Sequence, residues 1–407
     1  MSGPLAGLRV LDLTRVVAGP FATQTLGDLG ADVLKIERKG EGDDCRRVGP
    51  PWMTGLDGAD TDESTYFQAV NRNKRSVAID FAIPDGAEIV RRLAARCDIL
   101  VENYRPGTLD RYGLGYRALS SDNPSLIYCA ISGFGQTGPY AERSGYDYLV
   151  QGMGGVMSVT GARDGEQGAG PTRVGVPLVD IMAGMNATIG VLAALQYREK
   201  TGRGQFVDVS LFDAQVSALL NTASAWLNSG VVLGRTGNDH PSAAPYGVYE
   251  ASDGHIIIAT FNDREFQRLA DALGHPEWKV DPKYATNGGR VANRAAIKAE
   301  ISAIIALQPR HFWVDKLNAA TVSCGPINDM KDLEKDPQVM AREMIVRMGH
   351  PQFGEVRMAA SPHRLSASPV EYRRSAPILG QDTEAVLQDV LGLSTAELEA
   401  ARSAGAI

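Results

Sequence analysis

The first 130 residues alternate between short apolar runs, typical of strands, and amphipathic runs, typical of helices. One helical pattern opens at Pro20 and ends at Gly30, and another covers 85–97. Proline at a helix start and glycine just past a helix end are expected at those places. Because strands that alternate with helices form a parallel sheet covered on both faces, the pattern predicts an α/β fold. The predicted strands are 9–14, 31–37, 76–81, 98–103 and 125–132.

The longest apolar helical pattern runs over 177–198 and contains small residues that permit close packing. A shorter helical pattern covers 145–160, and 206–214 runs from a strand into a helix. Because the long pattern is apolar over most of its length, we expect this helix to be buried against a neighbour or a partner subunit.

The irregular stretch 222–245 predicts a linker into a second, smaller domain. The run 246–261 is typical of a hairpin that turns at Ser252-Asp253-Gly254. Two or three helices follow, up to about residue 345, and 352–375 is proline-rich and is expected to be extended. The predicted domains are therefore 1–222, 223–345 and 346–407. The last of them ends in a helical pattern over 382–405, in which Ser394 and Glu397 can form a capping box.

Charge and composition exclude several classes of protein. The 407 residues carry a formal net charge of -7, which argues against nucleic acid as the main partner because phosphate contacts need a basic face. The six histidines are scattered singly, so no metal site is expected. The N-terminus lacks an apolar signal-peptide core, and glycine, aspartate or asparagine breaks the longest apolar stretches, so no membrane span is expected.

The four cysteines lie far apart in the sequence, with no CxxC pair among them: Cys45, Cys97, Cys129 and Cys324. A pattern without a disulfide framework is typical of a reducing compartment. The sequence therefore predicts a cytoplasmic protein.

One glycine motif resembles a dinucleotide-binding fingerprint. Residues 133–138, GFGQTG, form a literal GxGxxG after the strand 125–132. That fingerprint requires a helix that begins in the loop and an acidic residue about 20 positions further on. Here Pro139 and a polar stretch follow, so the motif is better explained as a tight turn at a strand end.

Several stretches together resemble the class III CoA-transferase family, which includes formyl-CoA transferases and carnitine CoA-transferases. The resemblance lies in LAGLRVLDLTRVVAGPFATQTLGDLGADVLKIER (5–38), NRNKRSVAIDF (71–81), VENYRPGTLDRYGLGY (101–116), SGYDYLVQGMGGVMSVTG (144–161) and GVPLVDIMAGMNATIGVLAALQYREKTGRGQFVDVSLFDA (175–214). They fall in the family's order over about half the chain. The resemblance implies an interlocked homodimer, in which each chain has a large Rossmann-like CoA-binding domain, a smaller α+β domain and a C-terminal segment that returns to the large domain.

Asp180 is the expected catalytic residue. It begins the long apolar helix in the motif PLVDIMAG, where a carboxylate is stabilised by the helix dipole. Position alone favours a first-turn helix acid, but the family motif places its catalytic aspartate here. The resemblance implies covalent catalysis through an aspartyl-CoA thioester, with CoA as a substrate and no permanently bound cofactor.

The resemblance also implies a set of CoA contacts. Arginines at such places suit phosphate groups because the guanidinium makes bidentate contacts. The matching positions are Val17, Ala18, Arg38, Ile79, Asn103, Tyr104, Arg105, Arg111, Tyr146 and Asp147.

Tyr146 separates two subtypes of this fold. The related alpha-methylacyl-CoA racemases use a histidine in a GHD motif together with the aspartate that matches Asp180, whereas this chain has Gly145-Tyr146-Asp147. Because a phenol ionises only at about pH 10, tyrosine is a poor base at neutral pH. The sequence favours the transferase; a 2-methylacyl-CoA racemase and a non-catalytic CoA-binding protein remain as alternatives.

The acids that exchange CoA are expected to be small dicarboxylates such as succinate, glutarate, itaconate or mesaconate. The stretch HPSAAPYGVY (240–249) resembles the small-domain entry of dicarboxylate-type members. His240 with a nearby arginine such as Arg235 is expected to meet a distal carboxylate, and Asn238 is a second substrate candidate. Residues 237–241 match the glycine-rich loop that supplies oxyanion donors in formyl-CoA transferases, but without a glycine run.

Overall fold

The computed structural model describes residues 3–407, and the chain divides into two compact units. The large unit consists of the residues up to Val156, Val174–Gly230 and Met340–Ile407, and the small unit of Met157–Arg173 and Val231–Val339. The segment Met157–Arg173, which we expected in the first domain, thus belongs to the small unit. The chain therefore passes between the units at four places.

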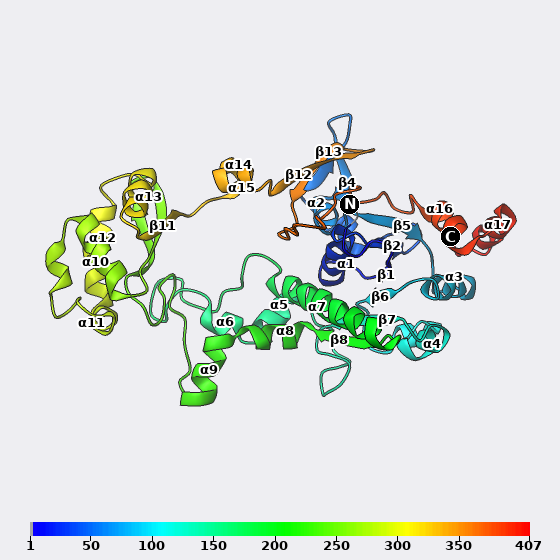
Figure 1. Ribbon diagram of the computed structural model, residues 1–407, viewed down its shortest axis with the longest axis horizontal. Helices are drawn as coiled ribbons and strands as arrows, with labels where there is room; N and C mark the ends of the chain where they lie inside the picture. Colours follow the sequence, from blue (N-terminus) through cyan, green and yellow to red (C-terminus); the bar gives the residue numbers. More distant parts are fainter. Residues whose placement is uncertain (1–2) are drawn as a thin grey trace. The chain divides into compact units, whose positions relative to one another are not determined.

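A six-stranded sheet with all neighbours parallel forms the centre of the large unit. Its strand order β5-β2-β1-β6-β7-β8 places the third strand of the sheet first, followed by the second, first, fourth, fifth and sixth (Figure 1). In this doubly wound order the connections reverse direction between β1 and β6, where such folds bind ligands at the carboxyl ends of the strands. The strands are β1 (Arg9–Leu13), β2 (Asp32–Glu37), β5 (Lys74–Ala78), β6 (Ile99–Glu102), β7 (Ile127–Ser132) and β8 (Phe206–Ser210).

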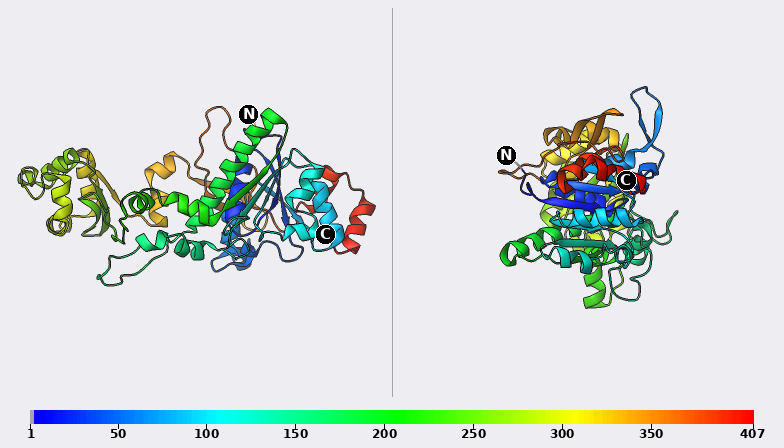
Figure 2. Two further views of the ribbon diagram at one scale, coloured as in Figure 1. Left: turned by 90° about the horizontal axis from the view of Figure 1, so that it is seen from below. Right: turned by 90° about the vertical axis from the view of Figure 1, so that its right-hand side faces the viewer.

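Helices cover both faces of this sheet (Figure 2). Leu11, Leu34 and Leu100 face one set of helices and Val10 and Val33 the other, because side chains alternate along each strand. The first set is α3 (Pro84–Ala94), α4 (Tyr116–Asp122), α16 (Thr383–Leu391) and α17 (Thr395–Ser403), and the second is α1 (Ala18–Asp28), α5 (Asp147–Met153), α7 (Leu178–Thr201) and α8 (Leu211–Ala218). The C-terminal helices therefore complete the core of the large unit, as expected.

The long apolar helix α7 packs on α1 and on β7 and β8. It has the length and composition of a membrane-spanning helix, but Ala183, Ala187 and Val191 are buried in the core of the large unit. Its small residues allow close approach, since a Cβ on Gly184 would lie 2.6 Å from the carbonyl oxygen of Ala18. The expected close packing is confirmed for this face, while Met185 and Ile189 on another face are exposed.

Two helical predictions were too long. The pattern 382–405 forms two helices, because Gly392 adopts φ +69° and ends α16. Ser394 then caps α17, with the predicted capping box to Glu397 present. Likewise 145–160 forms α5 and the short α6 (Val156–Val159), separated by Gly154 and Gly155.

Two hairpins in the large unit were not predicted. β3 (Trp52–Thr54) pairs with β4 (Asp60–Ser64), and β12 (Ile345–His350) pairs with β13 (Gly354–Ala359). β13 falls inside the segment 352–375, which we expected to be extended. The remaining short elements of this unit are η1 (Asp44–Arg47), α2 (Thr65–Val70), η2 (Leu109–Tyr112) and α9 (Leu220–Ser229).

The small unit is an α+β structure with its own core around Phe266, Ile301 and Leu317. The predicted hairpin is confirmed: β9 (Tyr246–Ala251) pairs with β10 (Gly254–Ala259) across a turn at 252–253, and β11 (Ser323–Pro326) completes the antiparallel sheet. The helices that follow are α10 (Asp263–Leu273), η3 (Pro276–Lys279), α11 (Asn287–Ala292), α12 (Arg294–Ile305), α13 (Arg310–Ala319), α14 (Met330–Lys335) and α15 (Pro337–Ala341), the last of which crosses the boundary between the units.

Candidate active site

Asp180 lies in the first turn of α7 and is half-buried. The residue before it, Val179, donates its N–H to Oδ1 of Asp147 (2.7 Å), and Gln151 Nε2 donates to Oδ2 of the same carboxylate (2.7 Å). Burial, and secondly the charge of Asp147, raise the pKa of Asp180 to about 7. Burial thus favours the neutral form of the Asp180 carboxyl group and leaves its anion poorly solvated.

A cavity of about 220 Å³ lies at the carboxyl ends of the sheet strands and includes Asp180 in its wall. Its position agrees with the point where the strand order reverses, because its lining comes from the loops after β1, β6 and β7. Six of the residues predicted to contact CoA line this cavity: Val17, Ala18, Asn103, Tyr104, Arg105 and Tyr146.

The loop after β1 reaches this cavity through a strained residue. Val16 has φ +68°, a conformation that is unfavourable for a β-branched residue. Asp43 fixes it by accepting the Val16 N–H (3.0 Å), and Lys35 Nζ pairs with the same carboxylate (2.8 Å) and donates to Thr14 O (2.9 Å). This fully buried ion pair therefore positions the backbone at Val17.

The loop after β6 is tied to the same strand-end loop. Asn103 accepts the N–H of Arg15 (2.9 Å) and donates to the Arg15 carbonyl (2.7 Å). The Arg15 guanidinium lies over the ring of Tyr104, with its central carbon 4.8 Å from the ring centre. Buried Glu102 accepts the Tyr104 N–H (2.7 Å), and burial raises the pKa of Glu102 to about 8. Asn103 is therefore a clamp between two loops of the site.

A second cavity, of about 310 Å³, shares Arg15, Asp44 and Tyr104 with the first. It contains two more of the predicted CoA contacts, Arg38 and Ile79. An elongated ligand can therefore extend from Asp180 past these shared residues towards the end of β2.

Two predicted CoA contacts lie outside both cavities. Arg111 lines a neighbouring hollow, which shares Phe81 and Tyr112 with the second cavity. Asp147 lines neither cavity, because its two oxygens accept bonds from Val179 and Gln151. In the structure, Asp147 holds the start of α7 in place through its bond to the Val179 N–H.

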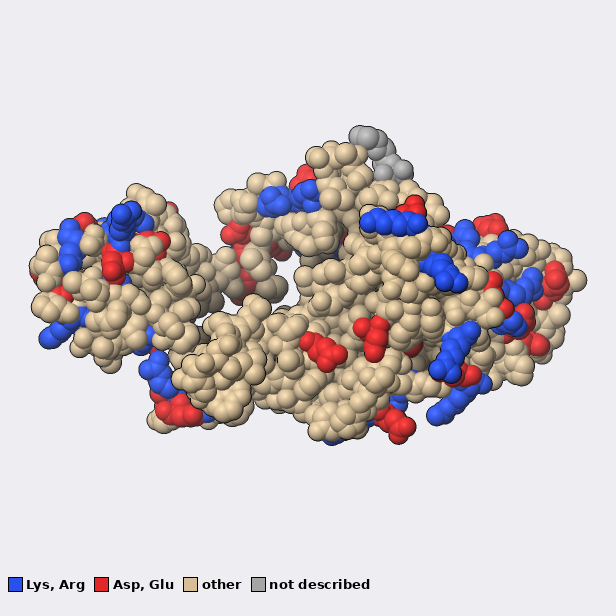
Figure 3. All heavy atoms as spheres, turned by 60° about the horizontal axis from the view of Figure 1, so that its bottom comes forward, with Lys and Arg blue, Asp and Glu red and all other residues tan. Residues whose placement is uncertain are grey.

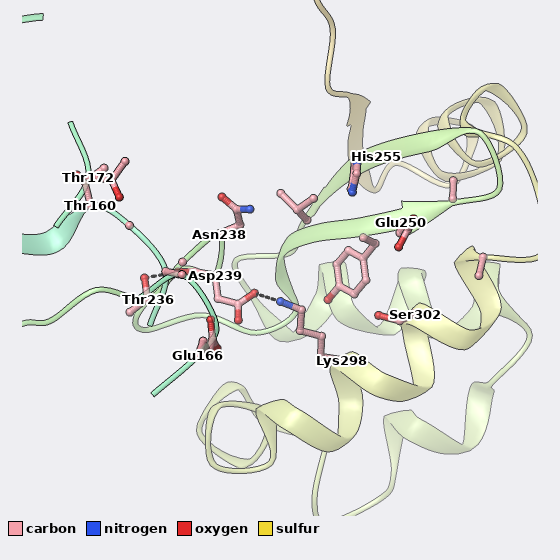
Figure 4. A pocket seen from close by; sticks show the side chains of 18 of the residues that line it. Thr160, Glu166, Thr172, Thr236, Asn238, Asp239, Glu250, His255, Lys298 and Ser302 are labelled. Atoms are coloured by element: carbon pink, nitrogen blue, oxygen red, sulfur yellow. Dashed lines mark hydrogen bonds and ion pairs between the residues drawn. The ribbon is translucent and has the colours of Figure 1, made fainter. Parts of the chain in front are cut away.

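The predicted substrate residues belong to the small unit. Asn238 lines a cavity of about 1390 Å³ there, where Asp239 pairs with Lys298 (2.7 Å) (Figure 4). His240 lies outside the lining of this cavity and stacks on Tyr246, with ring centres 5.0 Å apart. Arg235, suggested as the partner of His240, is instead paired with Asp164 and donates to Ala162 O (3.3 Å).

The stretch 237–241 offers few free N–H groups for an oxyanion. The N–H groups of Gly237, Asp239 and His240 donate to carbonyls of Gly161 (3.1 Å), Thr236 (3.2 Å) and Tyr246 (2.9 Å), respectively. Among the non-proline residues of this stretch, only the Asn238 N–H has no acceptor in the described part of the chain. The structure therefore leaves one N–H group of this stretch free, in keeping with the absence of a glycine run in its sequence.

The GxGxxG stretch is a turn, as the sequence favoured. No helix begins in it, and the Gln136 N–H donates to the carboxylate of Asp208 (3.0 Å) on β8. The first glycine serves a close backbone contact: a Cβ on Gly133 would lie 2.6 Å from Cα of Gly145. This contact brings the loop after β7 against the segment that carries Tyr146.

Sequence reasoning missed three side chains near Asp180. Arg15 and Arg143 line the same cavity, and the charge of Asp180, after burial, raises the pKa of Tyr66 to about 12. Arg15 lies within a matched motif and Arg143 next to one, so for these two the signal was present, whereas Tyr66 lies between two motifs. Only the fold shows which neighbours of a motif face the cavity.

A doubly wound unit with a half-buried carboxylate in its switch-point cavity defines an α/β protein with a ligand site at the carboxyl ends of its strands. Residues 5–383 match the model of CoA-transferase family III. The chain belongs to this family and is a transferase enzyme that uses CoA thioesters.

Named relatives and a solved structure extend over nearly the whole chain. Succinyl-CoA:glutarate CoA-transferase of Mus musculus is 40% identical and matches 99% of this chain and 90% of its own length. Succinate--glutarate CoA-transferase of Agrobacterium fabrum is 40% identical over 95% of this chain and 96% of its own. A CAIB/BAIF family protein from Brucella suis superposes with a TM-score of 0.86 at 42% identity, over 96% of this chain and 100% of that one.

Proposed function

We propose that this enzyme exchanges CoA between small dicarboxylic acids through a thioester on Asp180. The observation that carries the proposal is the half-buried Asp180 carboxylate, with a pKa of about 7, in the wall of the switch-point cavity. The relatives named for succinate and glutarate support dicarboxylates as the acids.

The proposed reaction needs no proton from the protein. An Asp180 oxygen attacks the thioester carbonyl of the donor, the C–S bond breaks, and a mixed anhydride and CoA thiolate form. The thiolate attacks the Asp180 carbonyl of the anhydride, which releases the donor acid and leaves aspartyl-CoA. The acceptor carboxylate then attacks this thioester, and the same two steps run in reverse to give acceptor-CoA and free Asp180.

The two cavities that share Arg15, Asp44 and Tyr104 support a position for each end of the CoA thioester. The reacting carbonyl belongs beside Asp180 in the first cavity, and the nucleotide belongs beside Arg38 and Ile79 in the second. Among residues 3–407, the Arg38 guanidinium pairs only with exposed Glu41 (2.9 Å). Because exposed ion pairs contribute little, a phosphate can replace this carboxylate at small cost.

Trapping of the intermediate tests the proposal directly. Incubation with succinyl-CoA followed by hydroxylamine is expected to modify Asp180, as mapped by mass spectrometry. Asp180→Asn has the same shape without a nucleophilic oxygen anion, so it should lose the adduct and lower transfer by at least about 10³-fold. Transfer of CoA to glutarate without any adduct at Asp180 would exclude the covalent mechanism.

We also propose that a second copy of the chain covers part of α7 and α9, to give the interlocked homodimer that the family resemblance implies. Met185, Ile189 and Leu192 recur at helical spacing on α7 and are exposed by 52%, 62% and 37%. Trp226 and Leu227 on α9 are exposed by 57% and 76%. An apolar area of this kind is typical of an obligate interface.

On the face drawn in Figure 3, small groups of Lys and Arg lie close to groups of Asp and Glu, with broad uncharged areas between them. A nucleic-acid partner would need an extended basic patch, and the face drawn in Figure 3 carries none.

A further inference from the structure

Arg143 is an arginine of the switch-point cavity without a carboxylate partner among residues 3–407. Its guanidinium lies over the ring of Tyr140, 4.6 Å from the ring centre, and 5.8 Å from that of Phe134. The two rings are packed edge to face at 5.5 Å. An arginine stacked in this way uses its flat face, so the N–H groups at its edge stay available.

The backbone around Arg143 is held in place by the loop after β7. Gly133 and Gly145 approach so closely that a Cβ on either would lie within 2.6 Å of the other's Cα. The Arg143 N–H closes a turn onto the Tyr140 carbonyl (2.9 Å). Gly133, the first glycine of the GxGxxG stretch, therefore supports the segment that carries Arg143.

The segment that follows Arg143 leads to the reacting carboxylate. Four residues later, Asp147 accepts the N–H of Val179 (2.7 Å), the residue next to Asp180. Both Arg143 and Asp180 line the same cavity of about 220 Å³. A ligand bound to both therefore has to be short, on the scale of a small dicarboxylic acid.

The other two arginines of the cavity are placed differently. Arg15 pairs with Asp44 (3.0 Å) and borders the second cavity as well. Arg105 follows Tyr104, which also lines both cavities. Arg15 therefore faces the part of the ligand that continues towards Arg38. Arg105 lines only the Asp180 cavity, as Arg143 does, and Arg143 differs from it in being stacked on Tyr140.

We propose that Arg143 binds the distal carboxylate of the dicarboxylic acid whose other carboxyl group reacts at Asp180. This inference rests on the proposed function and names the residue that selects its substrates. A carboxylate matches the edge of the guanidinium with two hydrogen bonds. An acyl group without a second carboxylate leaves this arginine unpaired, so the site favours dicarboxylic acids.

The test compares two donors of equal chain length, glutaryl-CoA and valeryl-CoA, by the rate at which each loads CoA onto Asp180. Arg143→Gln should lower the ratio of kcat/KM for glutaryl-CoA over valeryl-CoA by about 10- to 100-fold, the usual loss for a hydrogen bond to a charged group. Arg143→Lys keeps the charge but not the two-point contact, so it should lose less.

Arg117→Gln provides the matched control, because Arg117 is an exposed arginine of α4 that lines none of these cavities. The control should leave the ratio unchanged. If Arg143→Gln and Arg143→Lys, folded as judged by their thermal midpoints, slow both donors equally, the inference is wrong and Arg143 only supports the loop. If the wild-type protein loads neither donor, the proposed function is wrong, and so is this inference, which rests on it.

Discussion

At the scale of single residues, the ionisation of Asp180 decides when the enzyme can react. Burial is the larger cause of its raised pKa and the negative charge of Asp147 is the second. Because the nucleophile is the carboxylate, protonation removes it. Activity should therefore be present above about pH 7 and be lost as the pH falls through that value.

Asp147→Asn separates the two causes. The neutral amide still offers an oxygen to the Val179 N–H but removes the charge, so the acidic limb of the profile of kcat/KM against pH should move to lower pH. The midpoint of this limb should still lie above the pKa of an ordinary carboxyl group, because Asp180 remains buried. A limb that does not move at all would show that another group limits the rate at low pH.

At the scale of elements, the site is made by loops that bind to one another at the ends of parallel strands. The sequence located these loops, because each follows a clear apolar strand pattern and lies in a family motif. It assigned Asn103 to the ligand, and Asn103 does line the cavity, but the sequence did not show that the Asn103 amide also holds the backbone of Arg15. Such a role depends on two loops about 88 positions apart, and local patterns carry no information about that pairing.

Asn103→Ala tests this clamp. Loss of two hydrogen bonds should lower the free energy of unfolding by about 1–3 kcal/mol and raise the KM for succinyl-CoA, since Arg15 and Val17 line the cavity. Urea unfolding and initial rates measure the two effects. As a control, Asn318→Ala removes one exposed contact in the small unit, to Cys324 O (3.3 Å), and should change the KM little. A raised KM in both variants would contradict a local role.

The two hairpins also differ in how far their formation depends on residues that are distant in the sequence. The hairpin of β9 and β10 was predictable because its strands are adjacent to a turn and are rich in aromatic and β-branched residues. The hairpin of β3 and β4 was not, since its second strand, DTDES, is polar and half-exposed and is held by Arg46, which bonds Glu63 (2.9 Å) and buried Glu37 (2.8 Å).

At the scale of the whole molecule, the exposed apolar residues of α7 and α9 predict an obligate dimer. Light scattering should give twice the chain mass at all working concentrations. Ile189→Glu places a charge on the apolar face and should yield monomer or aggregate, whereas Val280→Glu, at a site exposed by 80% in the small unit, should remain dimeric. A monomeric wild-type protein would contradict the dimer whatever the variants do.

By itself, the sequence determined the α/β class, the long apolar helix, the family and the aspartate at the helix start, because each depends on a periodicity or a contiguous motif. Only the tertiary structure decided that 157–173 joins the small unit, that Asp147 and Asn103 bond to the protein, and that Arg143 lines the cavity of Asp180. These facts depend on which strand ends become neighbours, and the order of strands in a sheet is set by packing between segments distant in the chain.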